Sequence, residues 1–237
     1  LLEPLGIEQL VLVPFNKTLA SKSAEIFVDQ ILVKTLQAKH IAVGENFRFG
    51  RNREGDISTL KKIGALLGIK ISIIPILKDH DGRLSSSRIR KALNDGDLEH
   101  AKNLLNRPYT FKGTVERGKG LGKKIGWPTA NLKIDGRKFL PSLGVYAAWA
   151  SIANKKERFF AVMNLGPQPT IDPNSSSVAE VHLLKKEIDL LGQELTIEPV
   201  KRIRLQKKFG NFEALSNQIN FDAKLAKEIL IKDLQFN

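Results

Sequence analysis

Residues 113–132, GTVERGKGLGKKIGWPTANL, decide how the rest of this 237-residue chain is interpreted. Around their start Phe111, Gly113 and Val115 alternate with polar neighbours, which predicts a half-buried strand. A glycine- and lysine-rich loop follows, with the members Gly118, Lys119, Gly120, Gly122, Lys123 and Lys124. Mobile backbone with exposed N–H groups next to positive charge suits a phosphate group. The stretch is therefore a candidate phosphate-binding loop.

The loop differs from the two common nucleotide-binding patterns. A P-loop and a dinucleotide fingerprint both lead into a helix, whereas here two lysines and then Trp127 and Pro128 follow Gly122. Because Pro128 disfavours helix at the residue before it, we expect an extended segment that presents Thr129 and Asn131. A hydroxyl and an amide oxygen two residues apart suit Mg²⁺ bound to nucleotide phosphates. A glycine-rich surface hairpin followed by a turn is the alternative.

The composition limits the class of protein. The length fits one large or two modest domains, and a hydrophobic content of 42% is ample for a core. The sequence contains no run of about 18 apolar residues, so no membrane span is predicted. The absence of cysteine excludes disulfides and thiol catalysis and fits a reducing cytoplasm, where we expect the chain to act. With four scattered histidines, a structural zinc site is not expected.

The net charge of +13 points to an anionic partner. The part after Leu105 holds 22 basic and 13 acidic residues and so carries +9 of this total. Nucleic acid and a phosphorylated small molecule would both fit such a balance. A basic arm, zinc-finger spacing and an aromatic-rich strand are all missing, which argues against nucleic acid.

The first part of the chain alternates strands and helices. Residues 10–15, 40–43 and 71–76 are expected as strands and residues 24–38 and 58–67 as helices, which favours a parallel α/β sheet. The loop 44–50, with Asn46 and Phe47, follows a strand, where open α/β sheets place ligands. Ser86, Ser87 and Arg90 lie at the start of a later helix. They suit a phosphate there, or simple helix capping.

The pattern changes after Asn106, where we place the domain boundary. Strands are expected at 110–116, 144–152, 159–165, 178–184 and 195–205, followed by a long helix at 212–234. Such a series suggests a small antiparallel barrel with the helix against it. On the strand 178–184, Glu180 and His182 share one face. Near a phosphate loop, Glu180 would be a general base; otherwise it is a solvent-facing side chain.

Taken together, these stretches resemble the bacterial bifunctional riboflavin kinase/FAD synthetase, in the family's order and across nearly the whole chain. The motifs that carry the resemblance are residues 44–50 with 53–56, 85–90, 126–132, 144–146, 164–166 with 169–170, 180–184 and 208–209. The resemblance implies an incomplete Rossmann-like nucleotidylyltransferase α/β domain in residues 1–106. It implies a six-stranded riboflavin-kinase-type β-barrel with a C-terminal helix in residues 107–237.

The resemblance also implies roles for individual residues. The barrel would transfer the γ-phosphoryl group of ATP to riboflavin and give FMN, with Glu180 as general base and Thr129 and Asn131 as ligands of Mg²⁺ and phosphate. The loop with Gly118, Gly120, Gly122 and Lys123 would cover the nucleotide. The substrates riboflavin, FMN and ATP are then the partners, with neither nucleic acid nor a membrane involved.

The first part departs from the family in one respect. The family's adenylyltransferase domain opens with a strand and a His-x-Gly-His loop, and no histidine of this chain has that spacing. Asn46 stands where many members have Asp, while Ser86, Ser87 and Arg90 match the second phosphate motif. We therefore expect a truncated chain that lacks FAD synthetase activity and leaves apolar surface exposed.

Two other functions are weighed against the kinase. A flavin-binding or regulatory protein without turnover would use the same barrel, but it needs no base and metal ligands together. A basic nucleic-acid-binding module is favoured by the charge alone.

Overall fold

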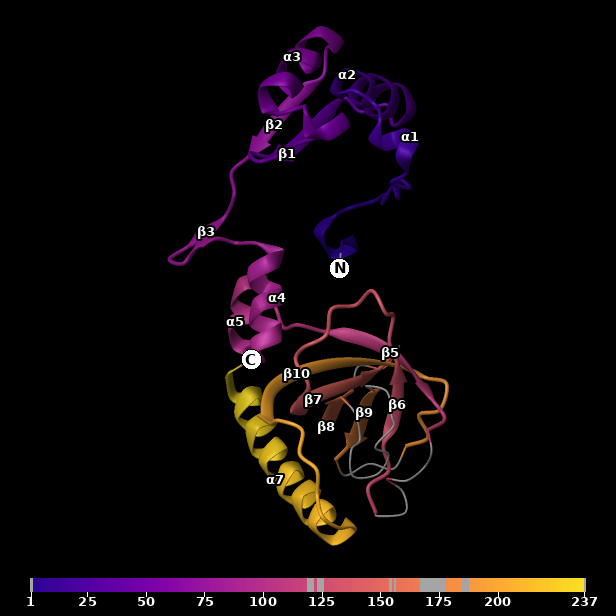
Figure 1. The fold of residues 1–237 in the computed structure, drawn as a ribbon, viewed down its shortest axis with the longest axis vertical. Helices are drawn as coiled ribbons and strands as arrows, with labels where there is room; N and C mark the ends of the chain where they lie inside the picture. Colours follow the sequence, from indigo (N-terminus) through magenta and orange to yellow (C-terminus); the bar gives the residue numbers. More distant parts are fainter. Residues whose placement is uncertain are drawn as a thin grey trace. The chain divides into compact units, whose positions relative to one another are not determined.

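The computed structural model describes residues 2–118, 122, 126–153, 155, 157–166, 178–184 and 188–236. The chain divides into two compact units, Leu1–Leu84 and Ser85–Asn237, whose elements Figure 1 labels. Each unit is described by itself. In the described part of the chain, no helix is both long and apolar enough to cross a membrane.

The first unit is built on a small parallel sheet. Strand β1 (His40–Gly44) pairs with β2 (Lys70–Ile74), and α3 (Ile57–Leu67) connects them. Further elements are η1 (Glu3–Leu5), α1 (Lys17–Ala20), α2 (Ala24–Ile26), the π-helix η2 (Phe27–Thr35), η3 (Arg51–Arg53) and the hairpin β3 (Lys78–Asp79) with β4 (Gly82–Arg83). Its hydrophobic core includes the buried side chains of Val28, Phe49 and Leu60. The predicted parallel α/β arrangement is thus confirmed.

Two expectations for this unit need correction. Residues 10–15 form no strand, and Leu12 and Phe15 are more than 80% exposed. A strand needs backbone partners, and the β1–β2 sheet pairs only its own two strands among the described residues, so the apolar composition was misleading. The helix predicted at 24–38 is present, but most of it is π-helix; the Leu36 N–H bonds to the Ile31 carbonyl at 3.0 Å.

The second unit is a closed antiparallel barrel with helices. Its strands are β5 (Phe111–Glu116), β6 (Ala130–Lys133), β7 (Gly144–Ile152), β8 (Arg158–Gly166), β9 (Val178–Leu183) and β10 (Glu194–Arg204), in the order β10-β5-β6-β9-β8-β7. The helices are α4 (Ser86–Asp95), α5 (Leu98–Leu105) and α7 (Phe212–Phe236). The predicted six-stranded barrel with its C-terminal helix is confirmed.

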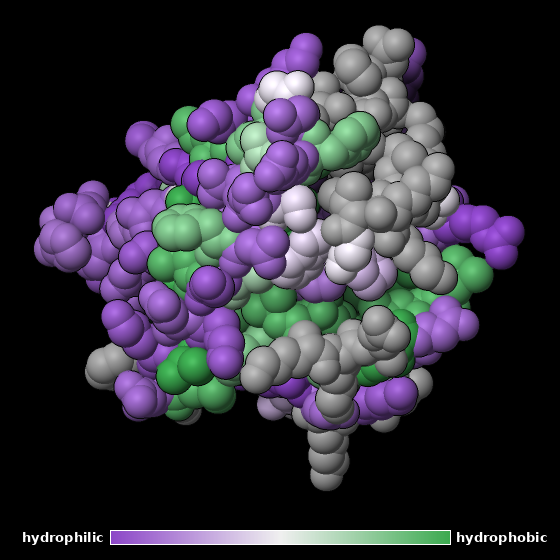
Figure 2. Space-filling model, turned by 90° about the horizontal axis from the view of Figure 1, so that it is seen from below, coloured by the Kyte–Doolittle hydropathy of each residue, from purple (hydrophilic) through white to green (hydrophobic). Residues whose placement is uncertain are grey.

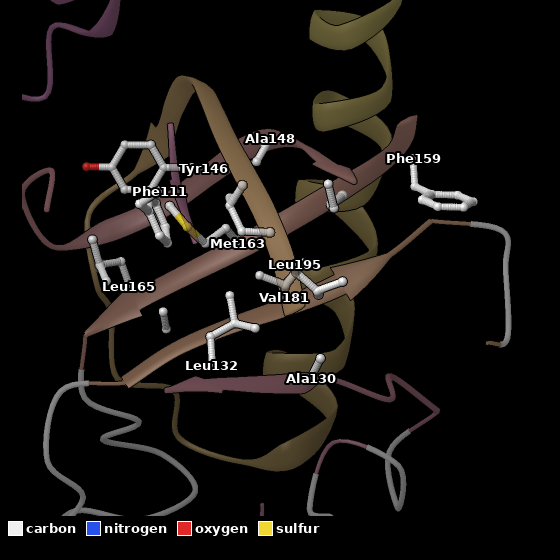
Figure 3. Close-up of a cluster of buried hydrophobic side chains, with 14 of the residues drawn as sticks. Phe111, Ala130, Leu132, Tyr146, Ala148, Phe159, Met163, Leu165, Val181 and Leu195 are labelled. Atoms are coloured by element: carbon white, nitrogen blue, oxygen red, sulfur yellow. The ribbon is translucent and has the colours of Figure 1, made fainter. Parts of the chain in front are cut away.

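Alternating side chains fill the barrel. Phe111, Leu132, Met163, Val181 and Leu195 are among those that point inward, as Figure 3 shows. On β7 both faces are buried, because Ala147 and Trp149 on the outer face pack with Ala226 and Leu230 of α7. One face of the barrel is therefore covered by α7, and the strands away from it keep their outer side chains only half buried.

Helices α4 and α5 belong to the core of the barrel unit. Leu93 and Leu98 are buried in the same cluster as the barrel's inner side chains. The Arg202 guanidinium donates to the Asp95 carbonyl at 3.0 Å, and the Ser142 N–H donates to the Leu93 carbonyl at 3.0 Å. The compact unit thus begins at Ser85, whereas the boundary at Asn106 stays a prediction about the family's two domains.

Candidate active site

The segment ahead of β6 is held against β9. The ring of Trp127 meets the ring of His182 edge-on, with centroids 4.7 Å apart. Nδ1 of His182 lies 2.7 Å from the Pro128 carbonyl, and since a carbonyl only accepts, Nδ1 carries the proton. This contact fixes the backbone immediately before Thr129.

Two glycines of the predicted loop contact the predicted metal ligands. A Cβ added to Gly118 would lie 1.9 Å from Nδ2 of Asn131. One added to Gly122 would lie 2.4 Å from the Trp127 carbonyl and 3.2 Å from Oγ1 of Thr129. Neither glycine has a left-handed backbone conformation. The close approach of neighbouring atoms is therefore what requires glycine at these two positions. Gly120 and Lys123 lie outside the described residues.

The register of the barrel places Asn131 and Glu180 side by side. Asn131 on β6 is the direct cross-strand partner of Glu180 on β9, and Glu180 in turn pairs with Asn164 on β8. Because Ala130, Ala179 and their alternating neighbours fill the core, this row lies on the outer face. Direct partners in an antiparallel pair have Cβ atoms about 4.5–5.5 Å apart. An amide, a carboxylate and a second amide thus form one half-buried polar row.

This row can carry out phosphoryl-transfer chemistry. A carboxylate accepts a proton from a hydroxyl, and the oxygens of Thr129 and Asn131 are the hard donors that a divalent cation prefers. The described glycines leave room at its edge. The structure therefore brings together Gly118, Gly122, Thr129, Asn131 and Glu180 among the residues singled out from the sequence.

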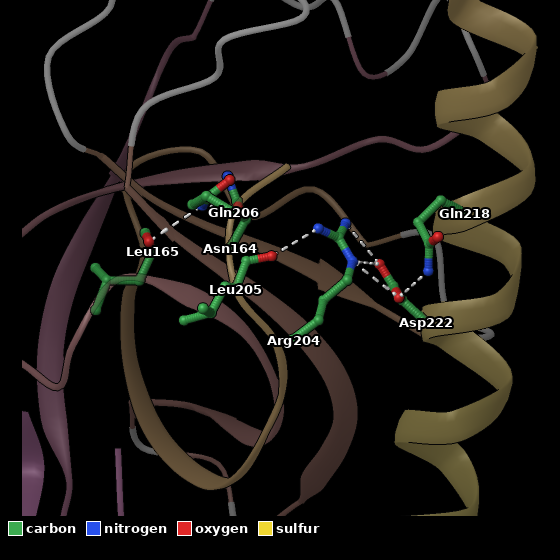
Figure 4. Close-up of polar contacts among 7 residues, drawn as sticks. All are labelled: Asn164, Leu165, Arg204, Leu205, Gln206, Gln218 and Asp222. Carbon is green, nitrogen blue, oxygen red and sulfur yellow. Dashed lines mark hydrogen bonds and ion pairs between the residues drawn. The ribbon is translucent and has the colours of Figure 1, made fainter. Parts of the chain in front are cut away.

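Beyond the row, a polar network joins the end of β10 to α7. Arg204 forms an ion pair with Asp222, with Nη2 and Oδ2 2.8 Å apart, and Asp222 is 1% exposed (Figure 4). Gln218 also donates to Asp222, at 2.9 Å. Gln206 donates to Oδ1 of Asn164 at 2.6 Å. Sequence reasoning missed these contacts, although one signal was present: Asp222 interrupts the apolar stripe of α7 that contains Leu215, Ala226 and Leu230.

The first unit holds a separate pocket of about 460 Å³ beyond β1. It is lined by Glu45, Asn46, Phe47, Arg48, Arg53, Asp56, Ile57, Ser58 and Arg83. Asp56 caps α3, and its hydrogen bonds from Thr59 hold its pKa below the usual value. The predicted residues Asn46 and Phe47 thus lie at a pocket that follows a strand, and its three arginines suit an anion.

The remaining predicted residues lie on α4 of the second unit. Ser85 caps this helix by accepting from the Arg88 N–H at 3.4 Å. Ser86 and Ser87 are its first two residues and are exposed, and Arg90 donates to Ser87 at 3.2 Å. The capping interpretation therefore applies to Ser85, while the first turn of α4 presents two further hydroxyls.

Family models match both parts of the chain. Residues 105–230 match the family described as riboflavin kinase, and residues 1–88 match that described as FAD synthetase. The bifunctional riboflavin kinase/FMN adenylyltransferase of Escherichia coli K12 is 36% identical over 94% of this chain and 70% of its own length. The protein with that name from Bacillus subtilis 168 is 35% identical over 95% and 71%.

A solved structure shares the fold over most of the chain. This crystal structure, described as a macrolide-efflux protein from Streptococcus pneumoniae, has a TM-score of 0.82 and 30% sequence identity. The match covers 95% of this chain and 72% of that one.

Proposed function

The chain belongs to the family of bifunctional riboflavin kinases/FMN adenylyltransferases, and from this premise we propose how its barrel phosphorylates riboflavin. The enzyme is a transferase that moves the γ-phosphoryl group of ATP to the 5′-hydroxyl of riboflavin and yields FMN. The observation that carries the proposed site is the direct pairing of Asn131 with Glu180 across β6 and β9. A phosphate-binding amide and a proton-accepting carboxylate then flank the same reacting group.

Glu180 is the proposed general base. Its carboxylate is half buried on the outer face of β9, within one strand spacing of the amide of Asn131. A hydroxyl bound here would lose its proton to Glu180 as the bond to phosphorus forms and the bond to the ADP oxygen breaks. Positioning and charge neutralisation supply most of the rate enhancement in such transfers, and removing a base costs about 10²-fold or more.

Thr129 and Asn131 fit a magnesium ion by the chemistry of their oxygens. Both are hard, uncharged donors, and Gly118 and Gly122 lie closely against them. Thr129 and Asn131 would hold Mg²⁺, which when bound would supply positive charge against the phosphates. We assign to Gly118, Gly120, Gly122 and Lys123 the role of covering the nucleotide phosphates.

The flavin ring needs an apolar surface beside the row. Seen from below, the molecule exposes apolar residues (Figure 2). In the second unit, Leu205 after β10 and Phe212 at the start of α7 are each about 60% exposed. We propose that this segment between β10 and α7 covers the flavin.

The pocket of the first unit is the proposed place for the second activity of the family. The FAD synthetase match covers the residues that line it, and Arg48, Arg53 and Arg83 would bind phosphate groups. Since no histidine of this chain has the His-x-Gly-His spacing, we expect residues 1–106 to lack transfer of AMP to FMN, and we propose the pocket only as the remaining phosphate site of that activity.

One assay tests the kinase proposal. The purified chain is incubated with riboflavin, ATP and Mg²⁺, and the flavins are separated by chromatography. FMN should accumulate, and an excess of chelator should stop its formation. Absence of FMN would contradict the kinase. Appearance of FAD would contradict the expectation that this chain lacks the adenylyltransferase activity.

A further inference from the structure

Asn164 lies next to the proposed base but has no role so far. It stands on β8 directly opposite Glu180 on β9, and both side chains point to the outer face. Asn164 is half buried there. A side-chain amide carries an acceptor oxygen and a donor NH₂ group, so its effect on a neighbouring carboxylate depends on which of the two faces it.

The contact with Gln206 settles the orientation of this amide. Nε2 of Gln206 lies 2.6 Å from Oδ1 of Asn164 and 3.2 Å from the backbone carbonyl of Leu165. A backbone carbonyl only accepts, so the group of Gln206 that faces it must be the NH₂. The same NH₂ then requires an acceptor from Asn164, which is its oxygen. The NH₂ of Asn164 is therefore turned away from Gln206.

The strand order places Glu180 on the side of Asn164 away from β7. Gln206 follows β10, which pairs with β7, and β7 pairs with one edge of β8. Glu180 lies on β9, along the other edge of β8. With its oxygen held from the β7 side, the amide of Asn164 presents its donors toward β9.

Two further features hold Gln206 in place. Gly166 has a φ of +136°, and a Cβ there would lie 3.1 Å from Nε2 of Gln206, so glycine leaves the room this amide occupies. Arg204 forms an ion pair with buried Asp222 and donates to the carbonyl of Leu205 at 3.1 Å, as Figure 4 shows. The segment that carries Gln206 is thus fixed from both sides.

We propose that Asn164 is a positioning residue for riboflavin phosphorylation, whose NH₂ donates to the Glu180 carboxylate because Gln206 holds the amide oxygen. This inference rests on the proposed role of Glu180 as base. A donor at this point fixes the direction of the carboxylate. If the Asn164 amide were flipped, its oxygen would face the Glu180 carboxylate, and the two oxygens would repel each other.

Two other charged side chains near Asn131 and Glu180 have partners of their own. Among the described side chains of this face, His182 lies on the same strand as Glu180, but its Nδ1 is committed to the Pro128 carbonyl. Glu116 pairs with Lys133, at 2.9 Å, on the far side of Asn131. The uncharged amide of Asn164 is the neighbour on the β8 side.

The test is the substitution Asn164→Asp in the full chain. It replaces only the NH₂ by oxygen and keeps the acceptor for Gln206. We expect kcat for FMN formation to fall about 10- to 100-fold with the KM for riboflavin within about twofold. Asn220→Asp, on the exposed face of α7, is the matched control and should change neither.

A second variant tests the same contact without introducing the negative charge of Asn164→Asp. Gln206→Leu frees the Asn164 amide to flip and should lower kcat about fivefold or more, whereas the same change in an Asn164→Leu background should add almost nothing. An independent effect of Gln206→Leu in that background would overturn the inference.

The outcomes separate the two proposals. A wild-type chain that makes no FMN would overturn the kinase function itself. A wild-type chain that makes FMN, with Asn164→Asp showing the same kcat, would overturn only the role of Asn164. Parallel losses of the melting temperature, flavin binding and kcat would point to a structural role and would overturn the inference as well.

Discussion

The strand register pairs Asn131 with Glu180, and neighbouring residues such as Gly118 determine whether the Asn131 side chain has room at the site. Gly118 has an ordinary backbone conformation, yet its missing side chain leaves the space for the amide of Asn131. Gly118 is therefore required by the space that it leaves for Asn131 and not by its backbone conformation.

Replacing Gly118 by alanine should harm catalysis more than folding. The new Cβ would overlap Nδ2 of Asn131, and a displacement of about 1 Å at a phosphoryl-transfer site can cost roughly 10²-fold in rate. We expect kcat/KM for ATP to fall at least tenfold with a melting temperature close to that of the wild type. Gly136→Ala is the control, because nothing lies within 4 Å of a Cβ there. Equal activity of the two variants would contradict the packing argument.

At the scale of elements, α7 is attached to the barrel by apolar contacts and one buried ion pair. Leu230 and Ala226 pack on Trp149 of β7, and Asp222 accepts from Arg204 at the end of β10. Trp149 also donates to Asp233 at 2.8 Å. The polar contacts fix the helix in one register along the strand end that leads into the flavin-covering segment.

Removing Asp222 should loosen this attachment. Asp222→Ala leaves Arg204 without its carboxylate in a largely buried place, which costs about 3 kcal/mol or more. The exposed pair of Asp95 with Lys91 offers a control, since Asp95→Ala should cost below about 1 kcal/mol. Urea unfolding measures both. Similar midpoints for the two variants would show that the buried pair contributes little.

Glu198 on β10 gives this region a pH dependence. Burial raises its pKa, against the opposing effect of Arg158, and Asp233 raises it further. The folded state therefore binds this proton more tightly than the unfolded state, so the contribution is present at low pH and is lost as pH rises through the raised pKa. As the pH is lowered from about 7 to about 4, the free energy of unfolding of the wild type should increase relative to that of Glu198→Gln. A difference that stays constant over this range would rule the effect out.

Most elements could be predicted from the sequence, and the misses have physical causes. Apolar runs bounded by turn residues located the strands β7, β8 and β10 within a residue or two. The short β6 was seen only as an extended segment. Residues 10–15 had the composition of a buried strand but have no sheet partner, which local pattern cannot reveal. The site residues came from the family motifs, while Gln206 and Asp222 depend on contacts between distant segments.

At the scale of the whole molecule, the compact units and the family domains divide at different points. Helices α4 and α5 fill the core of the barrel unit with Leu93, Leu98 and Ala101, although the riboflavin kinase match begins at residue 105. A stable kinase unit should therefore include them.

Two fragments test this division. Residues 85–237 should unfold in one cooperative transition and make FMN, because this unit contains its own core. Residues 107–237 should have a lower melting temperature, since burial of a large apolar side chain contributes about 1.5–3 kcal/mol and two leucines are removed. Identical melting temperatures would favour a boundary at Asn106.

The central claim is that Glu180, in register with Asn131, is the base of a riboflavin kinase. The most direct test compares FMN formation and riboflavin binding in the wild type and in Glu180→Gln, with exposed Glu99→Gln as control. We expect kcat to fall about 10²-fold or more while the Kd for riboflavin changes less than about threefold. Undiminished turnover in Glu180→Gln, or loss of binding and turnover in equal measure, would contradict this claim.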